Sequence, residues 1–192
     1  MGKWLVVYSS VTGNTKQIAE AMAAAAEDAD LFAVQDAPED LSAYEVVLAG
    51  YWLRRGAPDA RMAAFLPKLH GKEVALFETH GAQLHSEHTI TAFARAAYLL
   101  GPDCGVLGTF ACQGRINPAL IEMRKKAGPD DPHANTGENA ARWASAATHP
   151  DTADLAAAQD FVRHMYKKLE VRRRYMQQEQ KKHGGKPAAD GK

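Results

Sequence analysis

Residues 9–15, Ser-Ser-Val-Thr-Gly-Asn-Thr, place four hydroxyl side chains, one amide and one glycine between a strand-like and a helix-like segment. A glycine in such a turn lets the backbone approach a ligand closely. The first turn of the helix presents unpaired N–H groups at the positive end of its dipole. Such a turn binds a phosphate group without a cationic side chain. The candidate phosphate-binding residues are Ser9, Ser10, Thr12, Gly13, Asn14 and Thr15.

The same turn lacks the signatures of three other phosphate sites. It contains neither the GxxxxGK[ST] pattern of nucleoside-triphosphate loops nor the GxGxxG pattern of dinucleotide sites. The first strand also does not end on an aspartate, as it does in phospho-receiver domains of related topology. A neutral, hydroxyl-rich turn suits a monoester phosphate held away from solvent. A turn whose hydroxyls only cap the following helix is the alternative.

Short apolar segments alternate with helix-like segments over the first 110 residues. We expect strands at 3–8, 30–34, 45–50, 73–78 and 105–110, and helices at 15–27, 60–69 and 86–100. Continuous apolar runs indicate strands that are covered on both faces. The pattern therefore predicts an α/β fold: a three-layer α/β/α sandwich around a five-stranded parallel sheet of order 2-1-3-4-5. Extra helices follow strand five: one from Pro118, an alanine-rich one ending near 148, and one capped by Asp151.

Residues 8–15 resemble the phosphate-binding motif of flavodoxins, [S/T]-x-[T/S]-G-N-T, at its usual place after strand one. The resemblance covers residues 3–112. It implies a flavodoxin-like fold, non-covalent binding of FMN with the six residues named above around its phosphate, and a redox role. The continuation over residues 108–118 is similar to a flavodoxin-like branch, some of whose members accompany bilirubin-reducing enzymes.

The same resemblance implies that two further segments flank the flavin ring. Residues 50–56 supply Trp52 as the first choice for the shielding aromatic and Tyr51 as the second, with Leu53 beside them. Aromatic residues that only cover the sheet edge are the alternative. Residues 79–85 match the other flanking segment but lack its usual tyrosine, so the stacking partner there is either Leu84 or His85. The remaining candidates are Thr79, His80 and Gly81, with Cys112 at the end of strand five.

Composition and charge limit the class of protein. The chain is 46% apolar and 24% charged, as in globular proteins. It has no apolar run near the ~20 residues of a membrane span and shows no leader. We therefore expect a cytoplasmic protein without a membrane span or a nucleic-acid partner. Residues 163–192 hold ten Lys and Arg against three Asp and Glu. The whole chain has 23 of each, so residues 1–162 hold thirteen against twenty. We expect an FMN-binding domain at 1–170 and a basic, disordered tail at 171–192.

Three functions fit these features. The first is an electron carrier that accepts electrons from a reductase and delivers them to an acceptor enzyme; the missing NAD(P) fingerprint favours it. The second is a small FMN-dependent reductase of a quinone or tetrapyrrole. The third is a flavin-free phosphate-binding or interaction module. His80, His85, Glu87 and His88 could suggest a metal, but no further ligand or supporting group joins them, so we expect no metal site.

Overall fold

The computed structural model describes residues 2–82, 86–128, 130–131 and 133–183. Within these residues the sheet follows the order β2-β1-β3-β5-β6, and all of these strands are parallel. The added two-residue strand β4 shifts the numbering, so this is the predicted 2-1-3-4-5 order. The strands are β1 (Lys3–Tyr8), β2 (Ala29–Ala33), β3 (Tyr44–Arg54), β4 (Ala57–Pro58), β5 (Glu73–His80) and β6 (Gly105–Gln113).

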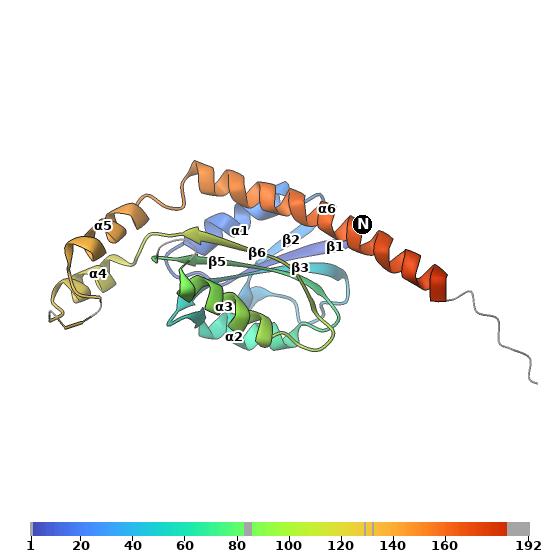
Figure 1. Ribbon diagram of the computed structural model, residues 1–192, viewed down its shortest axis with the longest axis horizontal. Coiled ribbons are helices and arrows are strands. Elements are labelled where there is room, and N and C mark those ends of the chain that lie inside the picture. Colours follow the sequence, from blue (N-terminus) through green and yellow to red (C-terminus); the bar gives the residue numbers. More distant parts are fainter. Residues whose placement is uncertain (1, 83–85, 129, 132, 184–192) are drawn as a thin grey trace, which may run out of the picture.

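Helices cover both faces of the sheet and confirm the three-layer sandwich (Figure 1). Helices α1 (Asn14–Ala25) and α6 (Thr152–His183) lie on one face, and α2 (Ala60–Phe65), the 3₁₀ turn η2 (Leu66–Lys68) and α3 (Glu87–Tyr98) lie on the other. Because side chains alternate along a strand, the central strands β1, β3 and β5 contribute side chains to two cores, one on each face of the sheet. The first core includes Trp4, Val6, Leu48, Phe77 and Met165, and the second includes Leu5, Val7, Ala49, Tyr51 and Leu76.

Strands β3 and β5 run further than their apolar patterns predict. The segment expected to leave strand three as a loop instead continues β3 to Arg54, because Tyr51 and Trp52 pair with β5. The strand then turns at Arg55 and Gly56 into β4. Both turn residues have positive φ, 53° and 71°, as a two-residue hairpin with the sheet's own twist requires. Arg95 of α3 donates hydrogen bonds to the carbonyls of this turn.

The chain after β6 forms the predicted extra helices. Helices α4 (Pro118–Lys125) and α5 (Gly137–Ala146) lie off the carboxyl ends of the strands (Figure 1). The Asn117 side chain caps α4, and the Asp151 carboxylate accepts the N–H groups of Ala153 and Asp154 at 2.8 and 3.0 Å at the start of α6. The predicted start of a helix at Pro118 and the predicted Asp151 cap are confirmed.

The C-terminal helix corrects the expected disordered tail. Helix α6 continues through residues 171–183 and extends past the sheet (Figure 1), so this part of the range is helical. Arg172 pairs with Glu73 and Arg173 with Glu45, at the amino ends of β5 and β3. These two contacts fix the basic run against the body. Residues 184–192 lie outside the described residues. In the described ranges, no helix combines the length and the apolar character needed to cross a bilayer.

Candidate functional site

The turn between β1 and α1 leaves the start of the helix open to a ligand. Gly13 occupies the N-cap position with φ of 87°, a left-handed conformation that favours glycine. No side chain caps α1, and its first turn carries no acidic residue. The N–H groups and the positive dipole end of this twelve-residue helix therefore provide a site for an anion.

Two hydroxyls of the turn accept hydrogen bonds within the turn and keep their own O–H groups. The Ser10 Oγ accepts a hydrogen bond from the Gly13 N–H at 3.1 Å, and the Thr12 Oγ1 accepts one from the Asn14 amide at 3.1 Å. Because both oxygens act as acceptors here, each hydroxyl still has its own O–H to donate. Lys16, the first cation after the turn, pairs with Glu20 on the exposed side of α1.

Ser9 has a different role from the one predicted. Its side chain is buried, and its hydroxyl donates to the Asp59 carboxylate at 2.8 Å. Asp59 also caps α2 through the Arg61 N–H. The Ser9 N–H donates to the Gly50 carbonyl at 2.8 Å. Ser9 thus joins the turn to β3 and α2 by hydrogen bonds, and Ser10 and Thr12 remain the candidate hydroxyl donors. Asp59 was recognisable in the sequence only as a helix cap.

Buried polar contacts join the turn to β5 and to the segment after β6. The Thr15 and Thr79 hydroxyls lie 2.8 Å apart and are almost fully buried. The Asn14 amide donates to the Arg115 carbonyl at 2.8 Å. A Cβ atom on Gly114 would lie 2.6 Å from that amide nitrogen, so the close approach needs a glycine. Three segments that are far apart in the sequence therefore meet at one edge of the sheet.

The aromatic residues of β3 are separated by the alternation of the strand. Tyr51 is fully buried, and its ring packs edge-on against Phe93 of α3 with centroids 6.3 Å apart. This burial removes Tyr51 as a stacking residue. Trp52 is partly exposed and pairs in register with Thr79, and Leu53 is also partly exposed. Trp52, the first choice from the sequence, therefore remains the aromatic candidate at the edge of the sheet.

Thr79 and His80 end β5 rather than starting a loop. His80 is buried, and its Nδ1 lies 3.1 Å from the Ala82 carbonyl, so this nitrogen carries a proton. The Gln113 amide donates to the same carbonyl at 2.8 Å. A Cβ on Gly81 would meet the Ile116 side chain at 2.4 Å, which brings the segment after β6 against this turn. Leu84 and His85 lie outside the described residues.

Cys112 belongs to the core and not to an open surface. The thiol is 1% exposed, lies on the face covered by α6, and donates to the Gln113 carbonyl at 2.8 Å. Burial raises the pKa of the thiol well above its usual range, and the Asp154 carboxylate raises it further. Cys112 therefore stays protonated and packs in the core at the end of β6.

Comparison with known proteins assigns the fold to a family. The family model described as "Flavodoxin domain" matches residues 5–163. This chain is a member of the flavodoxin family. It is 31% identical over 176 residues to the flavodoxin-like domain-containing protein BilS of Clostridioides difficile (strain CD3), covering 88% of this chain and 99% of that protein. A protein of the same name from Clostridium symbiosum (strain WAL-14163) is 29% identical over 181 residues, covering 83% of this chain and 94% of that protein.

Solved structures show the same architecture. Oxidised flavodoxin 2 from Bacillus cereus superimposes with a TM-score of 0.53 and 18% identity, covering 86% of this chain and 99% of that one. At this identity the likeness supports the fold alone. The family assignment and the strand order together confirm the flavodoxin-like fold that the turn after strand one predicted.

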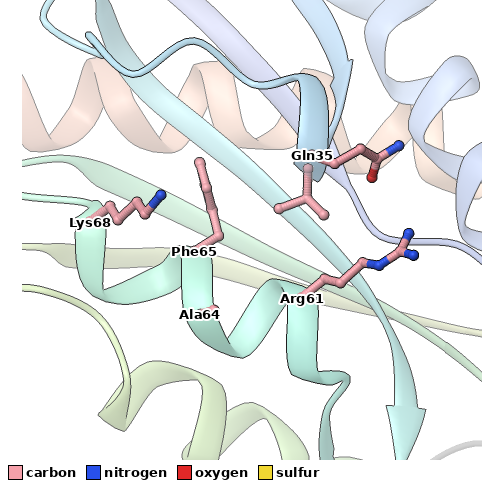
Figure 2. A pocket seen from close by; sticks show the side chains of 6 residues that line it. Gln35, Arg61, Ala64, Phe65 and Lys68 are labelled. Carbon is pink, nitrogen blue, oxygen red and sulfur yellow. The ribbon is translucent and has the colours of Figure 1, made fainter.

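Two hollows lie on the surface of this flavodoxin. One, of about 560 Å³, lies between α2 and the 3₁₀ turn η1 (Val34–Asp36), where the Gln35 and Arg61 side chains extend to the same side (Figure 2). None of the predicted site residues lines it. A second, of about 270 Å³, lies between the end of β6 and α5, and it is lined by Gln113, Glu138, Ala141, Arg142 and Ser145.

A cluster of three potential metal ligands begins α6. His149, Asp151 and Asp154 hold their ligand atoms within 4.8 Å of one another. The Asp151 carboxylate caps the helix, and the His149 Nδ1 lies 2.5 Å from an Asp154 oxygen that also accepts the Asp151 N–H. The hydrogen bonds of the helix start account for this cluster.

The close approach of Gly114 to Asn14 leads to a testable expectation. We expect G114A to weaken FMN binding by about tenfold or more, because the new methyl group must displace the Asn14 amide from the turn. Fluorescence quenching of FMN by the apoprotein measures the affinity. G128A is the matched control, since a Cβ there meets nothing within 4 Å. Equal affinities for the two variants would contradict the role of this contact.

Proposed function

We propose that this flavodoxin binds FMN and works as a cytoplasmic electron carrier, accepting electrons from a reductase and delivering them to an acceptor enzyme. The observation that carries the proposal is the turn after β1. Its helix start is uncapped, and Ser10 and Thr12 retain O–H groups for a phosphate. Membership of the flavodoxin family supports the same cofactor. When bound, FMN supplies one- and two-electron chemistry.

The residues of this chain would then have separate tasks. The α1 N–H groups, Ser10 and Thr12 hold the phosphate; Asn14 and Thr15 fix the turn against Arg115 and Thr79. Trp52 shields one face of the ring. Residues 1–162 carry thirteen basic against twenty acidic side chains, and this acidic body favours encounter with a basic partner surface. A reductase acting directly on a quinone or tetrapyrrole remains the alternative function.

The first test is binding of FMN to the apoprotein in a buffer without phosphate. We expect a complex at micromolar FMN or below, and competition by inorganic phosphate. S10A and T12A each remove one O–H donor to a charged phosphate, a hydrogen bond worth about 1.5–3 kcal/mol, and should weaken binding roughly tenfold or more. S42A, at an exposed serine outside the site, should bind as the wild type does. Absence of FMN binding would overturn the proposal.

The second test separates a carrier from a self-sufficient enzyme. The FMN-loaded protein is mixed with NADPH or NADH and a quinone, with and without an added flavodoxin reductase. A carrier turns over only when the reductase is present. Steady turnover without it would support the reductase alternative and would contradict the carrier role.

A further inference from the structure

A carboxylic acid without a hydrogen-bond partner lies inside the sheet, two residues before the end of β5. Glu78 is 0% exposed, and neither of its carboxylate oxygens has a hydrogen-bond partner among the described residues. The other acidic residue of this strand, Glu73, pairs with Arg172 at the opposite end. A buried, unpaired carboxylate is costly, so such a group is either neutral or tied to function.

The one polar group that acts on this carboxyl comes from the neighbouring strand. Tyr51 pairs in register with Glu78 across β3 and β5, and both side chains point to the face covered by α3. The Tyr51 hydroxyl is buried, and its interaction with the Glu78 carboxyl favours the charged form and so lowers the pKa of that carboxyl.

The other described neighbours of Glu78 carry no charge that pairs with it. On the other side of β5 the register partner of Glu78 is Ala111 of β6, and α3 presents the buried Thr89 and Ala92. His80, two residues along β5, is the titratable neighbour on the same face. Burial outweighs the effect of Tyr51 and raises the pKa of Glu78 from 4.5 to about 8. The carboxyl is therefore protonated at neutral pH.

The position of Glu78 connects it to the flavin site. Thr79, the next residue, contacts Thr15 of the phosphate-binding turn, and Trp52 follows Tyr51 in β3. Glu78 thus lies directly beside the residues that end β5 at this edge, with its side chain on the α3 face of the sheet and the Thr79–Thr15 contact on the other. A negative charge at this depth acts through a low-dielectric interior and is screened weakly by solvent.

We propose that Glu78 is a buried carboxyl beside the flavin site that holds its proton at neutral pH, so that the interior of the sheet carries no negative charge there. When Glu78 ionises at alkaline pH, its charge would lower the reduction potential of bound FMN. The inference rests on the proposed FMN binding. Glu78 touches no reacting atom and acts through its charge. Burial raises the pH at which that charge appears, and Tyr51 lowers it by a smaller amount.

The experiment compares wild type, E78Q, Y51F and E87Q. Infrared spectra of the apoprotein should show a protonated carboxyl band at pH 7 that disappears near pH 8 in the wild type and is missing in E78Q.

The midpoint potential of bound FMN is then measured from pH 6 to 10. We expect the potentials of the wild type and E78Q to differ by a constant amount below pH 7. Above pH 8 the potential of the wild type should fall progressively below that of E78Q. In Y51F the pH at which the potential begins to fall below that of E78Q should be higher than in the wild type. E87Q changes an exposed carboxyl on α3 and should behave as the wild type.

The outcomes separate this inference from the proposed function. If no variant binds FMN, the proposed function fails, and the infrared band alone then decides whether Glu78 holds a proton. If FMN binds and the potentials of wild type and E78Q remain parallel across the pH range, the inference is overturned. A wild-type apoprotein without a protonated carboxyl band at pH 7 would also overturn it.

Discussion

We expect the free energy of unfolding of E78Q minus that of the wild type to be about 4 kcal/mol larger at pH 9 than at pH 5. The carboxyl has its pKa raised from 4.5 to about 8 in the folded protein. Between these values the unfolded chain loses the proton while the folded chain retains it, so wild-type stability falls as the pH rises. The loss begins near pH 4.5 and is complete above pH 8. Glutamine does not titrate and removes this slope.

Urea denaturation of the apoprotein at four pH values between 5 and 9 measures the effect. The amide of the new glutamine also has to be accommodated without a partner, which changes the free energy of unfolding of E78Q by the same amount at every pH. Only the pH dependence of the difference between E78Q and the wild type therefore tests Glu78. E87Q, at an exposed carboxyl on α3, should follow the wild-type curve. Wild-type and E78Q stabilities that remain parallel from pH 5 to 9 would show that Glu78 ionises normally.

Glu78 also illustrates what the sequence could not reveal. In the segment 73–80 the apolar run stops at Phe77, so the pattern predicts a strand that ends at residue 78. In the structure β5 continues to His80, and β3 continues to Arg54 beside it. This pairing between β3 and β5 depends on residues that are distant in the chain. It buries Glu78 and Tyr51, and it makes most of the segment 50–56 part of a strand instead of a loop.

The phosphate-binding turn was predictable because its signal is local. The glycine that must take positive φ, the hydroxyls around it and the helix that follows all lie within seven residues. Contacts across the fold were not predictable in this way. Ser9 bonds to Asp59, fifty residues away, and Arg173 pairs with Glu45 across 128 residues. The basic composition of 171–183 indicated a solvated tail, whereas partners at the amino ends of the strands hold the start of this segment as helix.

Adding one methyl group at Gly50 will destabilise the fold by about 3 kcal/mol, at the upper end of the range for overpacking a well-packed core. A Cβ on Gly50 would lie 2.0 Å from the Phe77 ring, which is fully buried in the core beneath α1 and α6. A ring enclosed on all sides cannot rotate away, so the strands must separate or the ring must leave its rotamer. Gly50 also accepts the Ser9 N–H, so the displacement reaches the phosphate-binding turn.

A double-mutant cycle tests this cause. F77L alone leaves a cavity and should cost about 1–2 kcal/mol, within the range of volume-reducing core changes. In the G50A/F77L variant the smaller side chain makes room for the methyl group, so the double variant should be more stable than the sum of the single effects predicts, by more than about 1 kcal/mol. Urea denaturation of the apoprotein provides all three values. Additive effects would mean that G50A acts through the backbone of β3 rather than through Phe77, and the Phe77 ring would then not be what requires glycine at this position.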